Sequence, residues 1–174
     1  MSGTYPATLL ATRRVLRLLI GLNFLLAFLI GVLLVSSIVA QEFVMKALGV
    51  PPGTSTGGTI FGMRLIMVIG IVSAPLTNIV LTRLLAIVDT VKAGDAFMAE
   101  NAVRLRKIAC AALVLEVMHL VVGAVAAGAV PGGKRIGISW SFSFTPWLAV
   151  LLLFVLARVF EQGARMREDL AGTI

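Results

Sequence analysis

Four long stretches of this chain are almost free of charged residues. The hydrophobic pattern predicts helices over residues of about 15–40, 59–88, 108–130 and 146–162. A helix of about 20 apolar residues is long enough to cross the ~30 Å hydrocarbon core of a bilayer. The pattern therefore predicts an all-α polytopic membrane protein, a bundle of four transmembrane helices that forms a single membrane domain over residues 1–174.

Polar and helix-breaking residues separate these stretches. Residues 41–58 are rich in proline and glycine and predict an irregular loop. Residues 89–107 predict a charged middle loop, and residues 163–174 a polar tail. Residues 137–144 alternate apolar side chains with serines, which is typical of a short extended segment. Thr145, followed by proline, predicts the start of the fourth helix.

The composition supports this class of protein. Apolar residues make up 59% of the chain, charged residues 13%, and the mean hydropathy is +1.05. These values exclude an ordinary soluble domain and a disordered chain. With one cysteine and one histidine, the chain offers no internal disulfide, no Cys/His zinc site and no Ser/His/Asp set. We expect no enzyme activity, no cofactor, no metal and, without a basic stripe interleaved with aromatics, no direct nucleic-acid binding.

The distribution of basic residues predicts an orientation. Eleven of the 15 lysines and arginines fall on the side that carries the N-terminus, the middle loop and the tail. They are Arg13, Arg14, Arg17, Arg83, Lys92, Arg104, Arg106, Lys107, Arg158, Arg165 and Arg167. The opposite side carries Lys46, Arg64, Lys134 and Arg135. The positive-inside rule therefore places both termini and the middle loop in the cytoplasm.

Two segments resemble a known family. Residues 91–108 read VKAGDAFMAENAVRLRKI and residues 159–174 read VFEQGARMREDLAGTI. They resemble the middle-loop signature and the C-terminal ending of a bacterial membrane family catalogued as domain of unknown function 2975, although Ala96 stands where that family usually has proline. The resemblance implies a four-helix protein of the bacterial inner membrane, without a settled activity, whose genes are often neighbours of small helix-turn-helix regulators.

The residues of the two segments allow a structural and a functional interpretation. Structurally, Gly94 takes a positive φ at a turn, Asp95 accepts backbone N–H bonds, Phe97 dips toward the membrane interface, and Asn101 caps the third helix. Glu161 and Arg165 form an i,i+4 pair. Functionally, middle loop and tail helix together form a surface that docks a protein partner. Its candidate residues are Gly94, Asp95, Phe97, Glu100, Asn101, Arg104, Glu161 and Arg165.

Four polar residues lie inside the apolar stretches: Asn23, Asn78, Glu116 and His119. Glu116 and His119 are i,i+3 and share one face of the third helix. Because polar groups are costly at this depth, we expect them to form one polar layer. Three interpretations stay open: a hydrogen-bonded layer that fixes helix register, a proton or ion pathway, and a small-ligand pocket.

These observations favour a non-enzymatic membrane component of a regulatory circuit, whose cytoplasmic face binds a protein such as a small helix-turn-helix DNA-binding regulator. The alternative is a small proton- or ion-coupled transporter or channel that uses Glu116 and His119. The stripe that contains Gly123 and Ala127 is small enough for close helix contact, so a homo-oligomer in the lipid bilayer is a further expectation.

Overall fold

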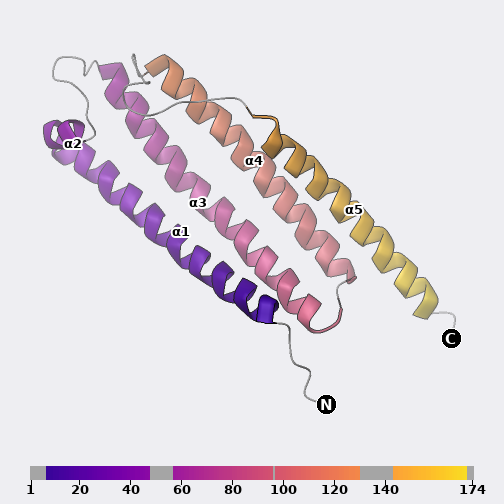
Figure 1. Ribbon diagram of the computed structural model, residues 1–174. Helices are drawn as coiled ribbons and strands as arrows, with labels where there is room; N and C mark the ends of the chain where they lie inside the picture. The colour runs from indigo at the N-terminus through magenta and orange to yellow at the C-terminus, as the bar shows by residue number, and fades with distance from the viewer. Residues whose placement is uncertain (1–6, 48–56, 96, 130–142, 172–174) are drawn as a thin grey trace. The chain divides into compact units, whose positions relative to one another are not determined.

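The computed structural model is helical over the residues that the structure describes, which are 7–47, 57–95, 97–129 and 143–171 apart from short turns (Figure 1). The helices are α1 (Ala7–Val39), α2 (Gln41–Ala47), α3 (Gly57–Lys92), α4 (Ala99–Ala129) and α5 (Thr145–Ala171). In this described part, α1, α3, α4 and α5 are each long and apolar enough to cross a membrane. The predicted all-α class is confirmed, and the four long apolar helices are compatible with the predicted bundle of membrane-spanning helices.

The chain divides into two compact units, and the long helices α1, α3 and α4 each contribute to both. Unit 1 contains residues 1–23, 76–114 and 144–174, and therefore the start of α1, the end of α3, the start of α4 and all of α5. Unit 2 contains residues 24–75 and 115–143. It therefore holds the end of α1, all of α2, the start of α3 and the end of α4.

The helices on either side of the predicted middle loop are longer than the sequence pattern indicated. Helix α3 continues to Lys92, and α4 begins at Ala99 rather than near residue 108. The predicted loop over 89–107 is therefore a short turn between two helix ends. The reason is that the charged part of α4 is amphipathic: Asn101 and Leu105 are buried on one face, while Glu100 points outward.

The predicted irregular loop over 41–58 is wrong at its start, because Gln41–Ala47 forms α2. All proline and glycine residues of that segment lie at or after residue 49, so nothing in 41–47 opposes a helix. Glu42 in the first turn and Lys46 in the last turn also match the helix dipole. Residues 48–56 lie outside the described part of the chain.

Helix α5 begins at Thr145, at the predicted place, but Thr145 is its first residue and not its cap, because the Leu148 N–H donates to the Phe144 carbonyl at 3.0 Å. It extends to Ala171, so most of the predicted tail 163–174 is helical. Helix α1 begins at Ala7 instead of near residue 15. The predicted extended segment over 137–144 lies almost entirely outside the described residues.

Small side chains dominate the interior of unit 1. Ala102, Ala109, Ala111, Ala157 and Ala164 are buried there, with relative exposures of 0 to 7%. Alanine allows helices in lipid to approach closely and gain dispersion contacts. Large apolar side chains of α5 are instead exposed; they include Leu148, Leu151, Leu152, Val155 and Val159. This is the distribution expected of helices whose outer surface meets acyl chains.

Candidate functional site

The turn between α3 and α4 is closed by a glycine in the left-handed region. Gly94 has φ +87°, which confirms the prediction for this residue. Its N–H donates to the Val91 carbonyl at 3.1 Å, and the Asp95 N–H donates to the Thr90 carbonyl at 3.2 Å. These bonds satisfy carbonyls at the end of α3. A Cβ at Gly94 would meet nothing within 4 Å, so the backbone conformation, and not space, favours glycine.

An ion pair joins this turn to α5. The Arg167 Nη2 lies 2.8 Å from the Asp95 Oδ1, and both side chains are about half exposed. We predicted that the Asp95 carboxylate accepts N–H bonds from the turn itself. Among the described residues it accepts from Arg167 instead, because the turn is already closed by the backbone bonds above. The carboxylate is thereby free to reach a second helix.

An aromatic contact joins the same two elements. The Phe97 ring lies 5.1 Å from the Phe160 ring of α5, centroid to centroid, at an interplanar angle of 31°. Gly163 lies beneath the Phe97 ring, and a Cβ there would come within 3.1 Å of the Phe97 Cδ1. Phe97, predicted at the membrane interface, therefore packs on a helix. Phe97, Phe160 and Gly163 therefore form an apolar contact between the turn and α5.

Asn101 has a different role from the predicted helix cap. Because α4 begins at Ala99, Asn101 lies inside its first turn, and its side chain is fully buried. Its Nδ2 donates to the Thr90 Oγ1 of α3 at 2.8 Å, and the Thr90 hydroxyl lies 2.8 Å from the Ile87 carbonyl. The Asn101 Oδ1 accepts from the Arg104 Nη1 at 2.8 Å. Asn101 thus connects α3 to α4.

The remaining charges of the site form pairs along the helix surfaces. Arg104 pairs with Glu100 at 2.9 Å. On α5, Glu161 accepts from Arg165 at 2.8 Å, the predicted i,i+4 pair, and lies 3.4 Å from Arg158. The Glu100, Arg158 and Arg165 side chains are 67%, 73% and 72% exposed. These charges are therefore available to a partner.

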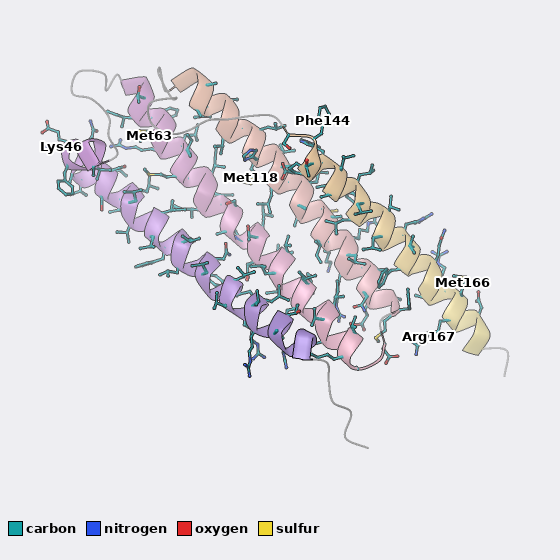
Figure 2. The ribbon with its side chains drawn as sticks, viewed as in Figure 1. Lys46, Met63, Met118, Phe144, Met166 and Arg167 are labelled. Carbon is teal, nitrogen blue, oxygen red and sulfur yellow. The ribbon has the colours of Figure 1, made fainter. Side chains whose placement is uncertain are left out.

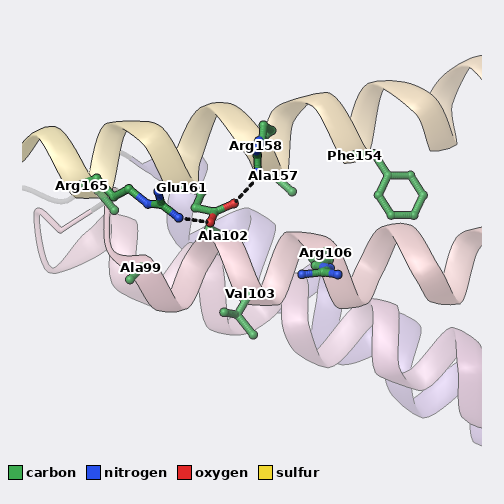
Figure 3. Close-up of a pocket in the computed structure, with 10 residues that line it drawn as sticks. Ala99, Ala102, Val103, Arg106, Phe154, Ala157, Arg158, Glu161 and Arg165 are labelled. Carbon is green, nitrogen blue, oxygen red and sulfur yellow. Dashed lines mark hydrogen bonds and ion pairs between the residues drawn. The ribbon is translucent and has the colours of Figure 1, made fainter.

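A groove of ≈ 470 Å³ runs between the start of α4 and α5 within unit 1. Figure 3 shows Glu161 bridging Arg158 and Arg165 on its α5 wall, with Val103 and Arg106 on its α4 wall. Phe154 and several alanines supply the apolar lining. The groove thus combines an apolar interior with charged edges of both signs.

All eight predicted docking residues lie in unit 1, and the structure divides them into two groups. The first group fastens the elements to one another and consists of Gly94, Asp95, Phe97, Asn101 and Arg104. The second group carries the exposed charges. Glu161 and Arg165 line the groove, and Glu100 lines a neighbouring hollow. Sequence reasoning missed the partners Thr90, Phe160, Gly163 and Arg167. The i,i+3 spacing of Phe160 and Gly163 was an available signal, since it places both on one face of the tail helix.

The two segments that carry these contacts are those that resembled a known family. A model of the family described as "Protein of unknown function (DUF2975)" matches residues 41–174. The chain belongs to this family. The match includes both segments together with α2, α3, α4 and α5, whereas α1 lies before it. No curated protein and no solved structure matches the chain.

The predicted intramembrane polar residues of this DUF2975 member are divided between the units. Asn23 and Asn78 belong to unit 1, and Glu116 and His119 belong to unit 2. The Asn78 Oδ1 is buried and has no hydrogen-bond partner among the described residues. On α4, Glu116 is partly buried and His119 is exposed. Among the described residues, no three His, Cys, Asp or Glu side chains lie together as a metal site would require.

Two arginines of this DUF2975 member make interhelical contacts that the sequence did not predict. In unit 2, the Arg64 Nη2 donates to the Ser37 carbonyl at 2.6 Å and to the Gln41 Oε1 at 3.2 Å. In unit 1, the Arg13 Nε lies 3.3 Å from the Asp89 Oδ1, within ion-pair range but without hydrogen-bond geometry. Arg64 ties α3 to the bend between α1 and α2, and Arg13 ties α1 to α3.

Proposed function

We propose that this protein is a non-enzymatic, membrane-tethered regulatory component that docks a cytoplasmic protein. The proposed docking surface consists of Glu100, Arg158, Glu161, Arg165 and the groove between α4 and α5. One observation carries the proposal: the two family segments contact each other through Asp95–Arg167 and Phe97–Phe160. Segments far apart in the chain thereby contribute to one exposed, charged surface.

The proposed orientation places unit 1 at the cytoplasmic side of a bacterial inner membrane. All eleven basic residues assigned to that side belong to unit 1, and of the four assigned to the opposite side the structure describes Lys46 and Arg64, which belong to unit 2. Cytoplasmic loops and helix ends carry an excess of lysine and arginine. Reporter fusions after residue 174 are expected to give a cytoplasmic signal, and a periplasmic signal would contradict the orientation.

The chemistry of the docking surface suits a protein segment. Its edges carry charges of both signs, Arg158 and Arg165 on either side of Glu161, which favours a partner with complementary charges. The groove has a volume of ≈ 470 Å³ and an apolar lining, so it has room for side chains of that partner. A small helix-turn-helix regulator is the candidate that the family resemblance suggests, and tethering it to the membrane would link its availability for DNA to the state of this protein.

Photo-cross-linking in cells tests the proposal. A photoreactive residue is placed at position 100 or 165 on the docking surface and, as a control, at Leu152, which is 66% exposed on the apolar face of α5. We expect both docking positions to capture the same cytoplasmic protein and Leu152 to capture none. Absence of any protein from positions 100 and 165, or equal capture at Leu152, would contradict the proposal.

A charge reversal tests whether the captured protein recognises the charges of the docking surface or only lies near it. With the photoreactive residue at position 100, Arg165→Glu is expected to reduce capture strongly, because it reverses one of the exposed charges of the surface. Arg14→Glu is the matched control, since Arg14 is an exposed arginine of unit 1 on α1. Equal capture in the two variants would mean that the surface charges are not recognised. A captured DNA-binding protein would identify the regulator directly.

A further inference from the structure

A second groove in unit 1 has a different chemistry. It lies between the end of α3 and the start of α4 and has a volume of ≈ 610 Å³. Its polar side chains are cationic: Arg83 from α3, and Arg106 and Lys107 from α4. Its apolar walls include Leu76, Ile79, Ala111 and Val114. No carboxylate is among the residues that line it, in contrast to the docking surface.

No carboxylate of the described residues lies within ion-pair distance of the three cations of this groove, although Arg83 and Lys107 also line a neighbouring hollow that includes Glu100. Arg83, Arg106 and Lys107 are exposed, and within the described residues none of them forms an ion pair or hydrogen bond. Neighbouring arginines of the same unit do: Arg104 pairs with Glu100, and Arg13 with Asp89. Three adjacent cations without a partner repel one another, so an external anion would stabilise them.

The groove is polar at one end and apolar at the other. Along α3 the chain runs from Arg83 back to Leu76, and along α4 from Lys107 on to Val114. At 1.5 Å per residue, each path covers roughly 10 Å. Both paths lead from the basic residues into the apolar stretches of membrane-spanning helices. A ligand that matches this groove has an anionic end and a long hydrocarbon part.

We propose that this groove binds an anionic phospholipid. Its phosphate group lies at Arg83, Arg106 and Lys107, and one acyl chain lies along Leu76, Ile79, Ala111 and Val114. Guanidinium groups match phosphate with two parallel hydrogen bonds, and basic pockets between transmembrane helices are typical sites for anionic headgroups. A zwitterionic lipid fits less well, because its headgroup has no net negative charge and its ammonium group would lie near three cations.

Cys110 provides a probe inside this groove. It is the one cysteine of the chain, it is exposed, and it is among the residues that line the groove. A small fluorophore on Cys110 is quenched when the protein is reconstituted in vesicles of brominated phosphatidylcholine. Unbrominated phosphatidylglycerol or phosphatidylcholine then replaces the brominated lipid in steps, and recovery of fluorescence reports which lipid occupies the groove.

The proposal predicts recovery at a lower mole fraction of phosphatidylglycerol than of phosphatidylcholine. Arg83→Gln with Arg106→Gln is expected to weaken this preference by about fivefold for each arginine removed. Arg14→Gln with Arg17→Gln removes the same charge from exposed positions on α1 and is expected to leave the preference for phosphatidylglycerol unchanged. Arg83→Lys with Arg106→Lys, which retains both charges, is expected to keep most of it and controls for misfolding.

Three results would overturn the proposal. The first is equal recovery with both lipids in the wild-type protein. The second is an equal loss of preference in the two glutamine double variants, which would mean that only general surface charge matters. The third is reversal of the phosphatidylglycerol effect by soluble glycerol phosphate, which would assign the site to a free phosphate and not to a lipid.

Discussion

Asp95 and Arg167 form an ion pair of 2.8 Å although 72 residues separate them in the chain. The pair joins the turn after α3 to the last turns of α5, where Figure 2 labels Arg167. The Phe97–Phe160 contact joins the same elements at 5.1 Å. One polar and one apolar contact therefore hold the turn against α5, and the docking surface depends on both elements.

The ion pair is expected to contribute little to stability. The Arg167 side chain is 58% exposed and the Asp95 side chain 44%. Exposed ion pairs typically contribute about 0.2–1 kcal/mol to stability. Asp95→Asn should therefore lower the free energy of unfolding by no more than that, and the loss should shrink at high salt. Thermal unfolding in detergent measures it. The charge swap Asp95→Arg with Arg167→Asp should restore the wild-type value, and a loss of several kcal/mol would contradict this assignment.

The aromatic contact should matter more than the ion pair. Phe97 is 49% exposed, so Phe97→Ala is expected to cost about 1–2 kcal/mol, below the 3–5 kcal/mol of a fully buried phenylalanine. A double-mutant cycle with Phe160→Ala isolates the ring contact, for which we expect a coupling of about 0.5–1.5 kcal/mol. Additive effects of the two substitutions would show that the rings do not stabilise each other.

The buried Asn101–Thr90 connection is expected to be essential for the α3–α4 junction. Asn101→Ala removes the donor to Thr90 and the acceptor of Arg104, and should cost about 1–3 kcal/mol. Thr90→Val leaves the buried Asn101 amide without this partner and should cost a similar amount. Combining Thr90→Val with Asn101→Leu removes both groups and should cost less than the sum. Unfolding free energies of the variants check this.

Replacing Asn78 by an apolar residue should stabilise the protein, whereas replacing Asn101 should destabilise it. The Asn78 Oδ1 is buried without a partner among the described residues, and an unsatisfied polar atom of this kind costs about 1–3 kcal/mol. Asn78→Leu is therefore expected to raise the melting temperature, whereas Asn101→Ala lowers it. A lower melting temperature for Asn78→Leu would instead indicate that the Asn78 amide has a stabilising partner in the membrane.

The membrane-spanning helices could be predicted because their apolar stretches are long and nearly uncharged. The ends of these helices could not, because charged residues such as Glu100 and Lys107 also occur in loops. The helical signal at the start of α4 was the buried stripe of Ala102, Leu105 and Ala109. Charged residues lie between these apolar positions and made the segment resemble a loop, so α4 was predicted to begin too late.

The candidate site was predicted in its residues but not in its contacts. Gly94 required only local reasoning, because a glycine between two helices indicates a positive φ. The roles of Asp95 and Asn101 depend on partners in other helices, and no local period relates a turn to a helix 72 residues away. Their side chains were therefore assigned to nearby backbone groups that the folded chain satisfies by other means.

The central claim is that the turn, through its contacts with α5, maintains the docking surface between α4 and α5, and one measurement tests it directly. A photoreactive residue at position 165 is combined with Phe97→Ala, and with Phe28→Ala as a matched control at an exposed phenylalanine of α1. We expect Phe97→Ala to reduce capture of the cytoplasmic protein several-fold, at equal membrane abundance, and Phe28→Ala to leave it unchanged. Undiminished capture with Phe97→Ala would show that α5 alone is recognised and would contradict the account.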